Sequence, residues 1–258
     1  MANQQTAKYT ITVTLIMCLV ASVLVAGSAV LLKPAQVANK ALDFKRNVLS
    51  IAGILNKDQS VEEQFKQVEI KIVDLSTGRF TDAITDVEKF DQNASAKKPD
   101  LSDKLSAEED IAKIISREKY AKVFLVNDAN GLSKVILPVR GYGLWSTMSG
   151  FVALDKDLNT VLGFGFYSHA ETPGLGGEVD NPKWKQIWIG KKIYSETGEV
   201  KIDVIKGHVD EATAEAEYKV DGLSGATLTS NGVDNLMKFW MGDKGYKSFL
   251  ANLKNGEA

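Results

Sequence analysis

An uncharged apolar run near the N-terminus, Tyr9–Leu32, constrains this chain more than any other feature. About 20 apolar residues, each adding about 1.5 Å of helix, cross the ~30 Å hydrocarbon core of a bilayer, and this run is longer. A cleaved signal peptide is the alternative, because 26–29 holds small residues, but its apolar core spans only ~7–15 residues. We therefore expect a short N-terminal tail (1–8), a retained transmembrane helix (9–32) and a soluble part (33–258).

The composition argues against several classes of protein. The formal net charge is -2, which gives no electrostatic support for nucleic-acid binding. The one cysteine, Cys18, lies inside the apolar run, so neither an internal disulfide nor a cluster held by several thiolates can form. The spacing of the two histidines, His169 and His208, does not indicate a metal site. Neither GxxxxGK[ST] nor G-x-S-x-G occurs, so nucleotide or ester hydrolysis lacks its usual signature, and we expect no catalytic triad.

Short runs rich in β-branched and aromatic residues predict a mostly antiparallel sheet in the soluble part. Strands are expected near 69–73 and at 201–206. Four more are expected between Ala121 and Ser168, in the runs AKVFLVN, KVILPV, GFVALD and VLGFGFYS. Turn-forming residues separate some of these runs, as hairpins require.

Helical patterns accompany these strands. A short helix is expected at 181–189, with Pro182 in its first turn, and an amphipathic helix near the C-terminus has one apolar face formed by Val233, Leu236, Met237 and Trp240. The polar stretch 81–110 is highly charged and is expected to be an insertion or a mobile surface region. The fold class expected is α+β: a single N-terminal transmembrane helix, then one domain with a mostly antiparallel sheet flanked by helices.

The segment Asp221–Asn231 (DGLSGATLTSN) combines small residues with hydroxyls just before the amphipathic helix. Gly225 and Ala226 let the backbone approach a ligand closely, while Ser224 and Thr227 offer hydroxyls. A helix N-terminus presents free N–H groups and a partial positive charge, which suit a phosphate. From the residues alone, a loop of small residues with a helix cap is an equally good interpretation.

The pattern Asp221-x-x-Ser224-Gly225-Ala226-Thr227 resembles the flavinylation motif of the covalent FMN-binding domains of bacterial respiratory complexes. In that family a flavin transferase moves FMN from FAD onto the last threonine of the motif, through a phosphodiester bond. The resemblance implies an FMN-binding domain with one covalent FMN per chain, attached to Thr227. Thr229 offers a second hydroxyl nearby but falls outside the pattern.

A second segment, HAETPGLG from His169 to Gly176, resembles the element that lies against the flavin ring in the same family. A flavin ring needs hydrogen-bond partners and an apolar surface, and Glu171 and Thr172 can supply the former and Leu175 the latter. Taken alone, the segment is equally a Gly-Pro turn. The resemblance implies that the flavin contacts include His169, Glu171, Thr172, Leu175 and Gly176.

Further contacts are expected from a segment that resembles the G-x-G-L-W element of these domains. Trp145 is expected near the flavin, with Ser146 and Thr147 near its ribityl or phosphate groups. The alternative for Trp145 is a core tryptophan at a strand end. Lys206 closes a predicted strand and can neutralise a phosphate, although a solvated lysine is the simpler interpretation.

The order of the apolar run, the helix around 44–49 and the two flavin elements resembles the C-subunit family of sodium-translocating NADH:quinone reductases over nearly the whole length. The G subunits of Rnf-type ferredoxin:NAD complexes share these elements but are typically shorter, and the charged stretch 81–110 favours the C subunits. A different class remains open, a membrane-tethered module that binds a phosphate ligand without a covalent bond.

This resemblance implies an electron carrier. In the family the flavin stands between an iron–sulfur centre held by other membrane subunits and a second covalent FMN, and the energy released drives sodium export. The partners implied are the other membrane subunits of the reductase, a flavin transferase during maturation and membrane lipid. NADH oxidation belongs to another subunit, so the isolated chain should not oxidise NADH.

The resemblance also implies a single-pass protein of the bacterial inner membrane with a periplasmic domain. The charges beside the apolar run weakly favour a cytoplasmic domain instead. More basic residues follow the run than precede it, and basic residues are enriched on the cytoplasmic side. Those that follow are Lys33, Lys40, Lys45 and Arg46.

Overall fold

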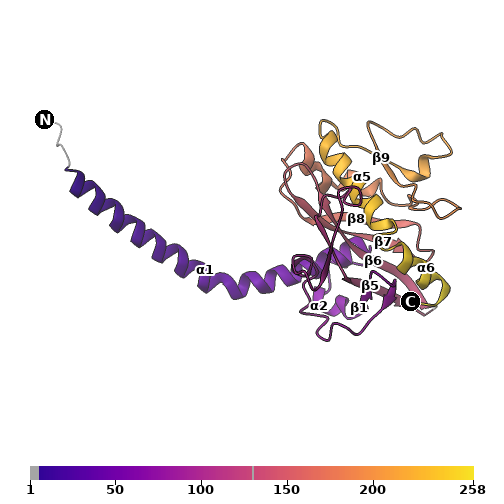
Figure 1. The fold of residues 1–258 in the computed structure, drawn as a ribbon, viewed down its shortest axis with the longest axis horizontal. Helices are drawn as coiled ribbons and strands as arrows, with labels where there is room; N and C mark the ends of the chain where they lie inside the picture. Colours follow the sequence, from indigo (N-terminus) through magenta and orange to yellow (C-terminus); the bar gives the residue numbers. More distant parts are fainter. Residues whose placement is uncertain (1–5, 130) are drawn as a thin grey trace. The chain divides into compact units, whose positions relative to one another are not determined.

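Residues 6–129 and 131–258 are described by the computed structural model in Figure 1. The chain divides into two compact units, Met1–Lys45 and Arg46–Ala258. Helix α1 (Ala7–Ile51) continues past the end of the apolar run, so the division lies further along the chain than the boundary expected after Leu32.

The apolar stretch of α1 is suited to a bilayer. Within the described part of the chain, α1 is the one helix long and apolar enough to cross a membrane. None of its most apolar window is buried, and Leu19 and Val25 are 66% and 69% exposed. A helix that exposes apolar side chains in this way is unfavourable in water and favourable among lipid chains. The structure therefore supports a membrane anchor.

The last turn of α1 belongs to the second unit and to its core. Val48 and Leu49 are fully buried there. The helix ends at Ile51, and Gly53 then adopts φ +68, a left-handed conformation that commonly follows a helix end. Gly163 lies so close to the carbonyl of Ile51 that a side chain at that position would collide with it.

A six-stranded antiparallel sheet, in the order β2-β1-β5-β6-β7-β8, forms the centre of the second unit. The strands are β1 (Val68–Asp74), β2 (Arg79–Phe80), β5 (Tyr120–Asp128), β6 (Gly131–Tyr142), β7 (Thr147–Asp155) and β8 (Val161–Ser168). The strands expected near 69–73 and within the four runs after Ala121 are confirmed as β1 and β5–β8. Their apolar side chains are buried on one face of the sheet or on both faces. The mostly antiparallel α+β class is confirmed with them.

Two small sheets accompany the main one. Strand β9 (Asp203–Ile205) pairs in parallel with β10 (Lys219–Asp221), which confirms the strand expected at 201–206. Strand β3 (Ser102–Lys104) pairs antiparallel with β4 (Ser116–Glu118). The parallel pair brings the end of β9 next to the segment that leads into the C-terminal helices.

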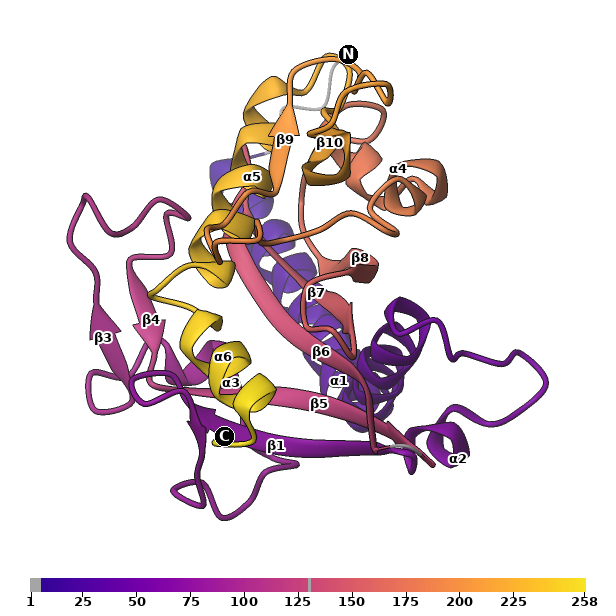
Figure 2. The same ribbon diagram turned by 90° about the vertical axis from the view of Figure 1, so that its right-hand side faces the viewer.

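Helix α5 (Thr227–Met241) lies along β6, and both it and α6 (Lys247–Asn255) cover the same face of the sheet in Figure 2. A Cβ at Gly141 would lie 2.8 Å from Leu236, so the absence of a side chain there permits close packing. The indole N–H of Trp240 donates to the carbonyl of Arg140 at 2.7 Å. These contacts fix the position of α5 against β6.

The remaining helices are short. They are α2 (Val61–Phe65), α3 (Gln92–Ser95), α4 (Pro182–Gln186) and the 3-10 helices η1 (Gly176–Asp180) and η2 (Ala216–Tyr218). The helix expected around 181–189 is confirmed as α4. Trp184 from α4 and Trp188 after it pack against Phe164 of β8, so this helix closes the core beside the last strand.

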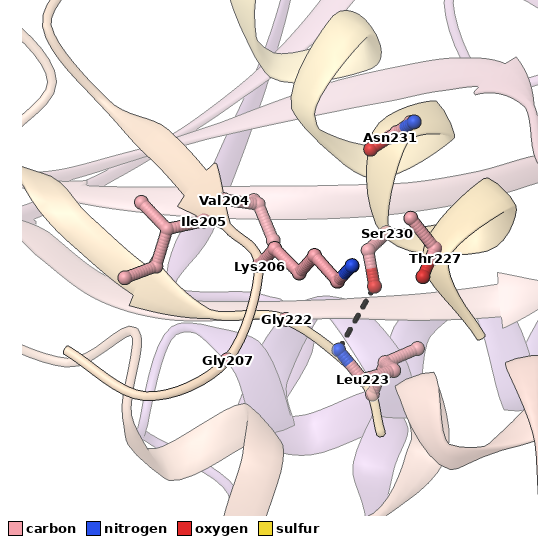
Figure 3. A pocket seen from close by; sticks show the side chains of 9 residues that line it. All are labelled: Val204, Ile205, Lys206, Gly207, Gly222, Leu223, Thr227, Ser230 and Asn231. Carbon is pink, nitrogen blue, oxygen red and sulfur yellow. Dashed lines mark hydrogen bonds between the residues drawn. The ribbon is translucent and has the colours of Figure 1, made fainter. Parts of the chain in front are cut away.

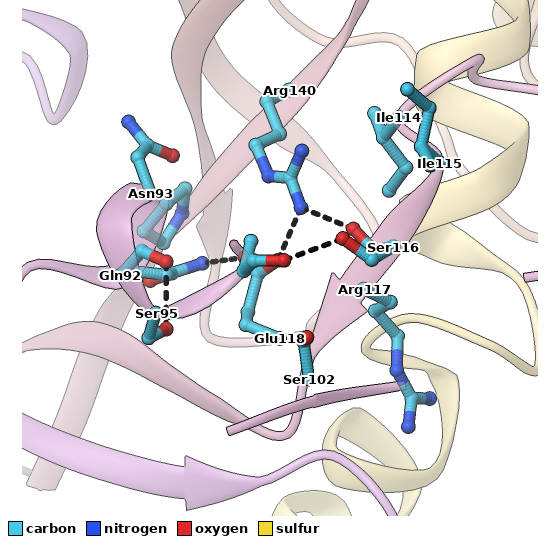
Figure 4. Close-up of polar contacts among 12 residues, drawn as sticks. Gln92, Asn93, Ser95, Ser102, Ile114, Ile115, Ser116, Arg117, Glu118 and Arg140 are labelled. Atoms are coloured by element: carbon cyan, nitrogen blue, oxygen red, sulfur yellow. Dashed lines mark hydrogen bonds and ion pairs between the residues drawn. The ribbon is translucent and has the colours of Figure 1, made fainter. Parts of the chain in front are cut away.

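The charged stretch 81–110 contains α3 and β3 and is attached to the sheet by buried polar groups (Figure 4). The Glu118 carboxylate, fully buried, accepts from Arg140 at 2.6 Å and from the side-chain amide of Gln92. Gln92 in turn accepts from the backbone N–H of Lys122 on β5 at 2.9 Å. One buried carboxylate therefore links this stretch to the central strands.

Candidate functional site

Thr227 is the first residue of α5, and its side chain is exposed. It lines a small pocket together with Lys206, Gly207 and Asn231 (Figure 3). In Figure 3 the Lys206 side chain extends from the end of β9 toward the first turn of α5. Ala226 occupies the N-cap position and has no side chain that can accept from the first N–H groups of α5. The helix start is therefore open to an anionic group, with a lysine beside it.

The loop before α5 follows from its small residues. Gly222 presses against the carbonyl of Ile205, where any Cβ would collide, so β10 leaves the small sheet in close contact with β9. Gly225 adopts φ +72, a left-handed conformation that favours glycine, and it lies beside the Leu175 side chain. These two positions turn the chain from β10 into α5.

Asp221, the first residue of the motif, holds a neighbouring loop. Its carboxylate accepts from the backbone N–H of Val209 at 2.8 Å and contacts Nδ1 of His208 at 2.7 Å. The loop 206–209 carries Lys206 and Gly207 at the pocket, so Asp221 helps to place Lys206. The sequence did not reveal this role of Asp221. It also did not reveal that Gly207 and Asn231 line the pocket, although Asn231 ends the segment Asp221–Asn231.

The hydroxyls near the start of α5 differ sharply in exposure. Ser224 and Thr227 are exposed. Thr229 is 1% exposed and donates to Glu171, whereas Ser230 is 4% exposed, accepts from the N–H of Leu223 and donates to the carbonyl of Ala226. A group outside the protein can therefore reach the hydroxyl of Thr227 but not that of Thr229.

Glu171 is buried and connects three segments. One carboxylate oxygen accepts from the backbone N–H groups of Leu144, Trp145 and Ser146 at 3.1, 3.0 and 3.3 Å, and the other accepts from Thr229 Oγ1 at 2.8 Å. Burial alone would raise the pKa of Glu171, but these hydrogen bonds together outweigh it and hold the pKa below its ordinary value. The carboxylate is charged at neutral pH and already has four donors from its own chain.

His169 lies at a different hollow from Thr227. Its Nε2 contacts Asp180 at 2.7 Å, and its Nδ1 accepts from the N–H of Glu171 at 3.2 Å. Lys185 also contacts Asp180, at 2.8 Å, and all three side chains line an open hollow at the end of β8. Burial tends to raise the pKa of Asp180, but Lys185 and His169 lower it overall. Asp180 is thus a partner of His169 that sequence reasoning missed.

The other expected contacts surround the start of α5. Trp145 and Leu175 are 65% and 47% exposed, so both offer apolar surface. Ser146 Oγ accepts from the N–H of Ala170 at 2.8 Å, and the carbonyl of Thr172 accepts from Leu175 and Gly177 at 3.1 and 2.9 Å. The bond between Ala170 and Ser146 ties the segment around Trp145 to the segment around Leu175, and the bonds to Thr172 close the turn 172–177.

Two further residues expected to contact the flavin, Thr147 and Gly176, are placed by the backbone of these segments. Thr147 begins β7, directly after the tied segment. Gly176 leaves no room for a side chain, because a Cβ there would collide with the hydroxyl of Thr229 and lie 2.8 Å from Glu171. The structure thus brings the segments 143–147, 170–176 and 221–227 together at one end of α5, whereas His169 lies at the other hollow.

This arrangement suits a ligand with an anionic end and a flat apolar part. The anion fits the open helix start beside Lys206, and Trp145 and Leu175 provide apolar surface nearby. Among residues 6–129 and 131–258, no group of three or more His, Cys, Asp or Glu side chains is arranged to hold a metal ion.

Comparison with known proteins identifies the family of the chain. Residues 143–242 match the FMN-binding domain family. The chain is 54% identical to the C subunit of the Na(+)-translocating NADH-quinone reductase of Pseudomonas aeruginosa, over 100% of both proteins. It is 46% identical to the C subunit of the Haemophilus ducreyi reductase, over 98% of this chain and 96% of that one. The crystal structure of Shewanella oneidensis NqrC matches with a TM-score of 0.78 and 37% identity, covering 84% of this chain and 99% of that one. The chain therefore belongs to the family of C subunits of Na(+)-translocating NADH-quinone reductases.

Proposed function

We propose that this chain carries FMN attached through its phosphate to Thr227, and that it passes electrons within a sodium-translocating NADH:quinone reductase. The observation that carries the proposal is the contrast among neighbouring hydroxyls. Thr227 is exposed at the open start of α5, whereas Thr229 and Ser230 are buried and hydrogen-bonded. Only the first of these three is accessible to a transferase.

The residues present fit FMN. The helix start and Lys206 suit the phosphate, because a partial positive charge and a lysine stand on the same pocket. Trp145 and Leu175 offer exposed apolar surface for the ring. When bound, FMN supplies one-electron and two-electron transfer. The chain's own tasks are to hold the cofactor, to shield one side of it and to present it to redox partners.

Attachment requires FAD as the donor and a flavin transferase as the catalyst. The oxygen Oγ1 of Thr227 forms a bond to the phosphorus of the FMN half of FAD. The bond from that phosphorus to the AMP half breaks, AMP leaves, and the hydroxyl proton passes to a base on the transferase. Thr213 is also an exposed threonine and lies outside the motif, so it is the control against which the specificity of Thr227 is tested.

We further propose that α1 anchors the chain in the inner membrane among lipid and that the soluble part, 33–258, is periplasmic. The exposed apolar surface of α1 supports the anchor. The other membrane subunits of the reductase would then be the donor and acceptor of electrons.

Mass spectrometry of the chain tests the proposal directly. The full-length chain is expressed with and without an active flavin transferase and FAD. We expect the peptide containing Thr227 to gain the mass of FMN less one water, and to lose that adduct in Thr227→Ala but not in the control variant Thr213→Ala. An unmodified peptide in folded protein, with the transferase active on a control substrate, would contradict the proposal. A yellow colour lost on denaturation would instead indicate non-covalent binding.

A further inference from the structure

The buried Glu171 carboxylate joins parts of the chain that are far apart in sequence. Three successive backbone N–H groups, from Leu144 to Ser146, converge on Oε1, and the hydroxyl of Thr229 in the first turn of α5 donates to Oε2. Consecutive N–H groups that converge in this way form a small anion-binding concavity. Here the anion is a side chain of the protein itself, only 5% exposed.

Glycines on both sides make room for this carboxylate. A Cβ at Gly143 would lie 2.6 Å from Oε1 of Glu171, and one at Gly176 would lie 2.8 Å from Oε2 and collide with the hydroxyl of Thr229. A larger residue at either position would displace the carboxylate or the helix. The close contact between Glu171 and Thr229 therefore depends on these two glycines.

The contact also holds the first turn of α5 in its rotation. Successive helix residues are separated by about 100° around the axis, so Thr227 and Thr229 point about 200° apart. Holding the Thr229 hydroxyl inward against Glu171 turns Thr227 outward, where it is exposed. The same carboxylate fixes the backbone of Trp145, so one group sets both the attachment residue and the loop beside it.

We propose that Glu171 is a positioning residue that presents Thr227 for flavin attachment and holds the Trp145 loop in place, with Thr229 as its partner on α5. This inference rests on the proposed attachment at Thr227. It assigns Glu171 a role within the protein rather than a direct contact with the flavin ring, because both of its oxygens are already occupied. A carboxylate suits the role because it only accepts hydrogen bonds, and all four of its partners donate.

Two variants of the full-length chain weaken this contact in different ways. Glu171→Gln keeps the shape but replaces one accepting oxygen with a donating NH2 group, and Thr229→Val replaces the hydroxyl with a methyl group. Thr229→Ser keeps the hydroxyl and serves as the conservative rescue. The controls are Asp157→Asn and Thr160→Val, at the opposite end of β8. Asp157 likewise accepts from two backbone N–H groups, at 2.9 and 2.8 Å, and from the hydroxyl of Thr160 at 2.6 Å.

Two measurements are made on each variant. The first is hydrogen exchange of the amides of 144–146 in the unmodified chain, which needs no flavin. The second is the initial rate of FMN incorporation by the transferase, followed by mass. We expect Glu171→Gln and Thr229→Val each to speed amide exchange at 144–146 and to slow incorporation by at least about tenfold, which corresponds to about 1.4 kcal/mol. Thr229→Ser and the two control variants should match the wild type in both.

The outcomes separate this inference from the proposed function. Wild-type incorporation at Thr227 with unchanged rates in folded Glu171→Gln and Thr229→Val would overturn the positioning role and leave the attachment intact. Faster exchange at 144–146 without slower incorporation would overturn it as well, since the contact would then serve stability alone. A wild-type chain that takes up no flavin would instead defeat the proposed attachment, and the exchange data would still report on the contact.

Discussion

The ion pair between Arg140 and Glu118 offers a stability prediction whose magnitude follows from burial. Arg140 Nη2 lies 2.6 Å from Glu118 Oε2 and also donates to the carbonyl of Ser116 at 2.7 Å. Figure 4 shows this pair, and the Arg140 and Glu118 side chains are 10% and 0% exposed. In Arg140→Met the carboxylate remains buried without its cation, which costs about 3–5 kcal/mol. Replacing both residues, in Arg140→Met/Glu118→Leu, removes the charge along with its partner and should restore most of that loss.

The assay is urea unfolding of the full-length chain in detergent, followed by tryptophan fluorescence. All 4 tryptophans lie in the second unit, so the signal reports on that unit. With an m-value of about 2 kcal/mol/M, the single variant should lower the midpoint by about 1.5–2.5 M urea. The double variant should lie much closer to the wild type.

The control is a surface pair of similar length. Lys66 and Glu63 lie 2.9 Å apart with side chains 70% and 69% exposed, so water screens their attraction and Lys66→Met should not shift the midpoint measurably. A single variant at Arg140 that loses less than about 1 kcal/mol, or a double variant as unstable as the single one, would refute the reasoning that an uncompensated buried charge dominates the loss.

Two further predictions concern the site. The pKa of Glu171 in the folded chain lies below its ordinary value of 4.5, so its stabilisation is complete above that pH and is lost as the pH falls through the lower folded value. The stability difference between wild type and Glu171→Gln should therefore shrink on acidification below pH 4.5, and urea midpoints that differ equally at neutral and acid pH would contradict this. Gly222→Ala places a methyl group against the carbonyl of Ile205, which should cost about 1–3 kcal/mol and lower the melting temperature by about 3–9 °C. The control Gly198→Ala adds a methyl group where no atom lies within 4 Å, so it tests backbone strain alone. A Gly222→Ala variant with the melting temperature of the wild type would rule out the close contact between Gly222 and the carbonyl of Ile205.

Local patterns were sufficient for much of the fold. The apolar run predicts a membrane helix because length and lack of charge are properties of the segment alone. The runs that became β5–β8 are rich in β-branched and aromatic residues, so each was identifiable without knowledge of its neighbours. Helix α5 was predicted from the 3.6-residue period of its apolar face.

The charged stretch 81–110 was harder to interpret, because its attachment depends on distant partners. Gln92 hydrogen-bonds to Glu118, and Glu118 pairs with Arg140. A polar side chain that will be buried in a network looks, in sequence, like one that will face water. The composition predicts an insertion or a mobile surface region, whereas the structure shows part of the stretch held by a fully buried carboxylate.

Dependence on distant partners also explains why the motifs did not reveal the hydrogen bonds at the site. A short pattern of small residues and hydroxyls, Ser224 to Thr227, marks the attachment segment because close backbone approach and a helix start are local requirements. Glu171 and His169 are also marked by a motif, but their partners, Thr229 and Asp180, are 58 and 11 residues away. Which oxygen accepts from which donor depends on how β8, the Trp145 loop and α5 pack together. Hydrogen-bond partners and exposure are properties of that packing, so only the tertiary structure decided that Thr227 faces outward and Thr229 inward.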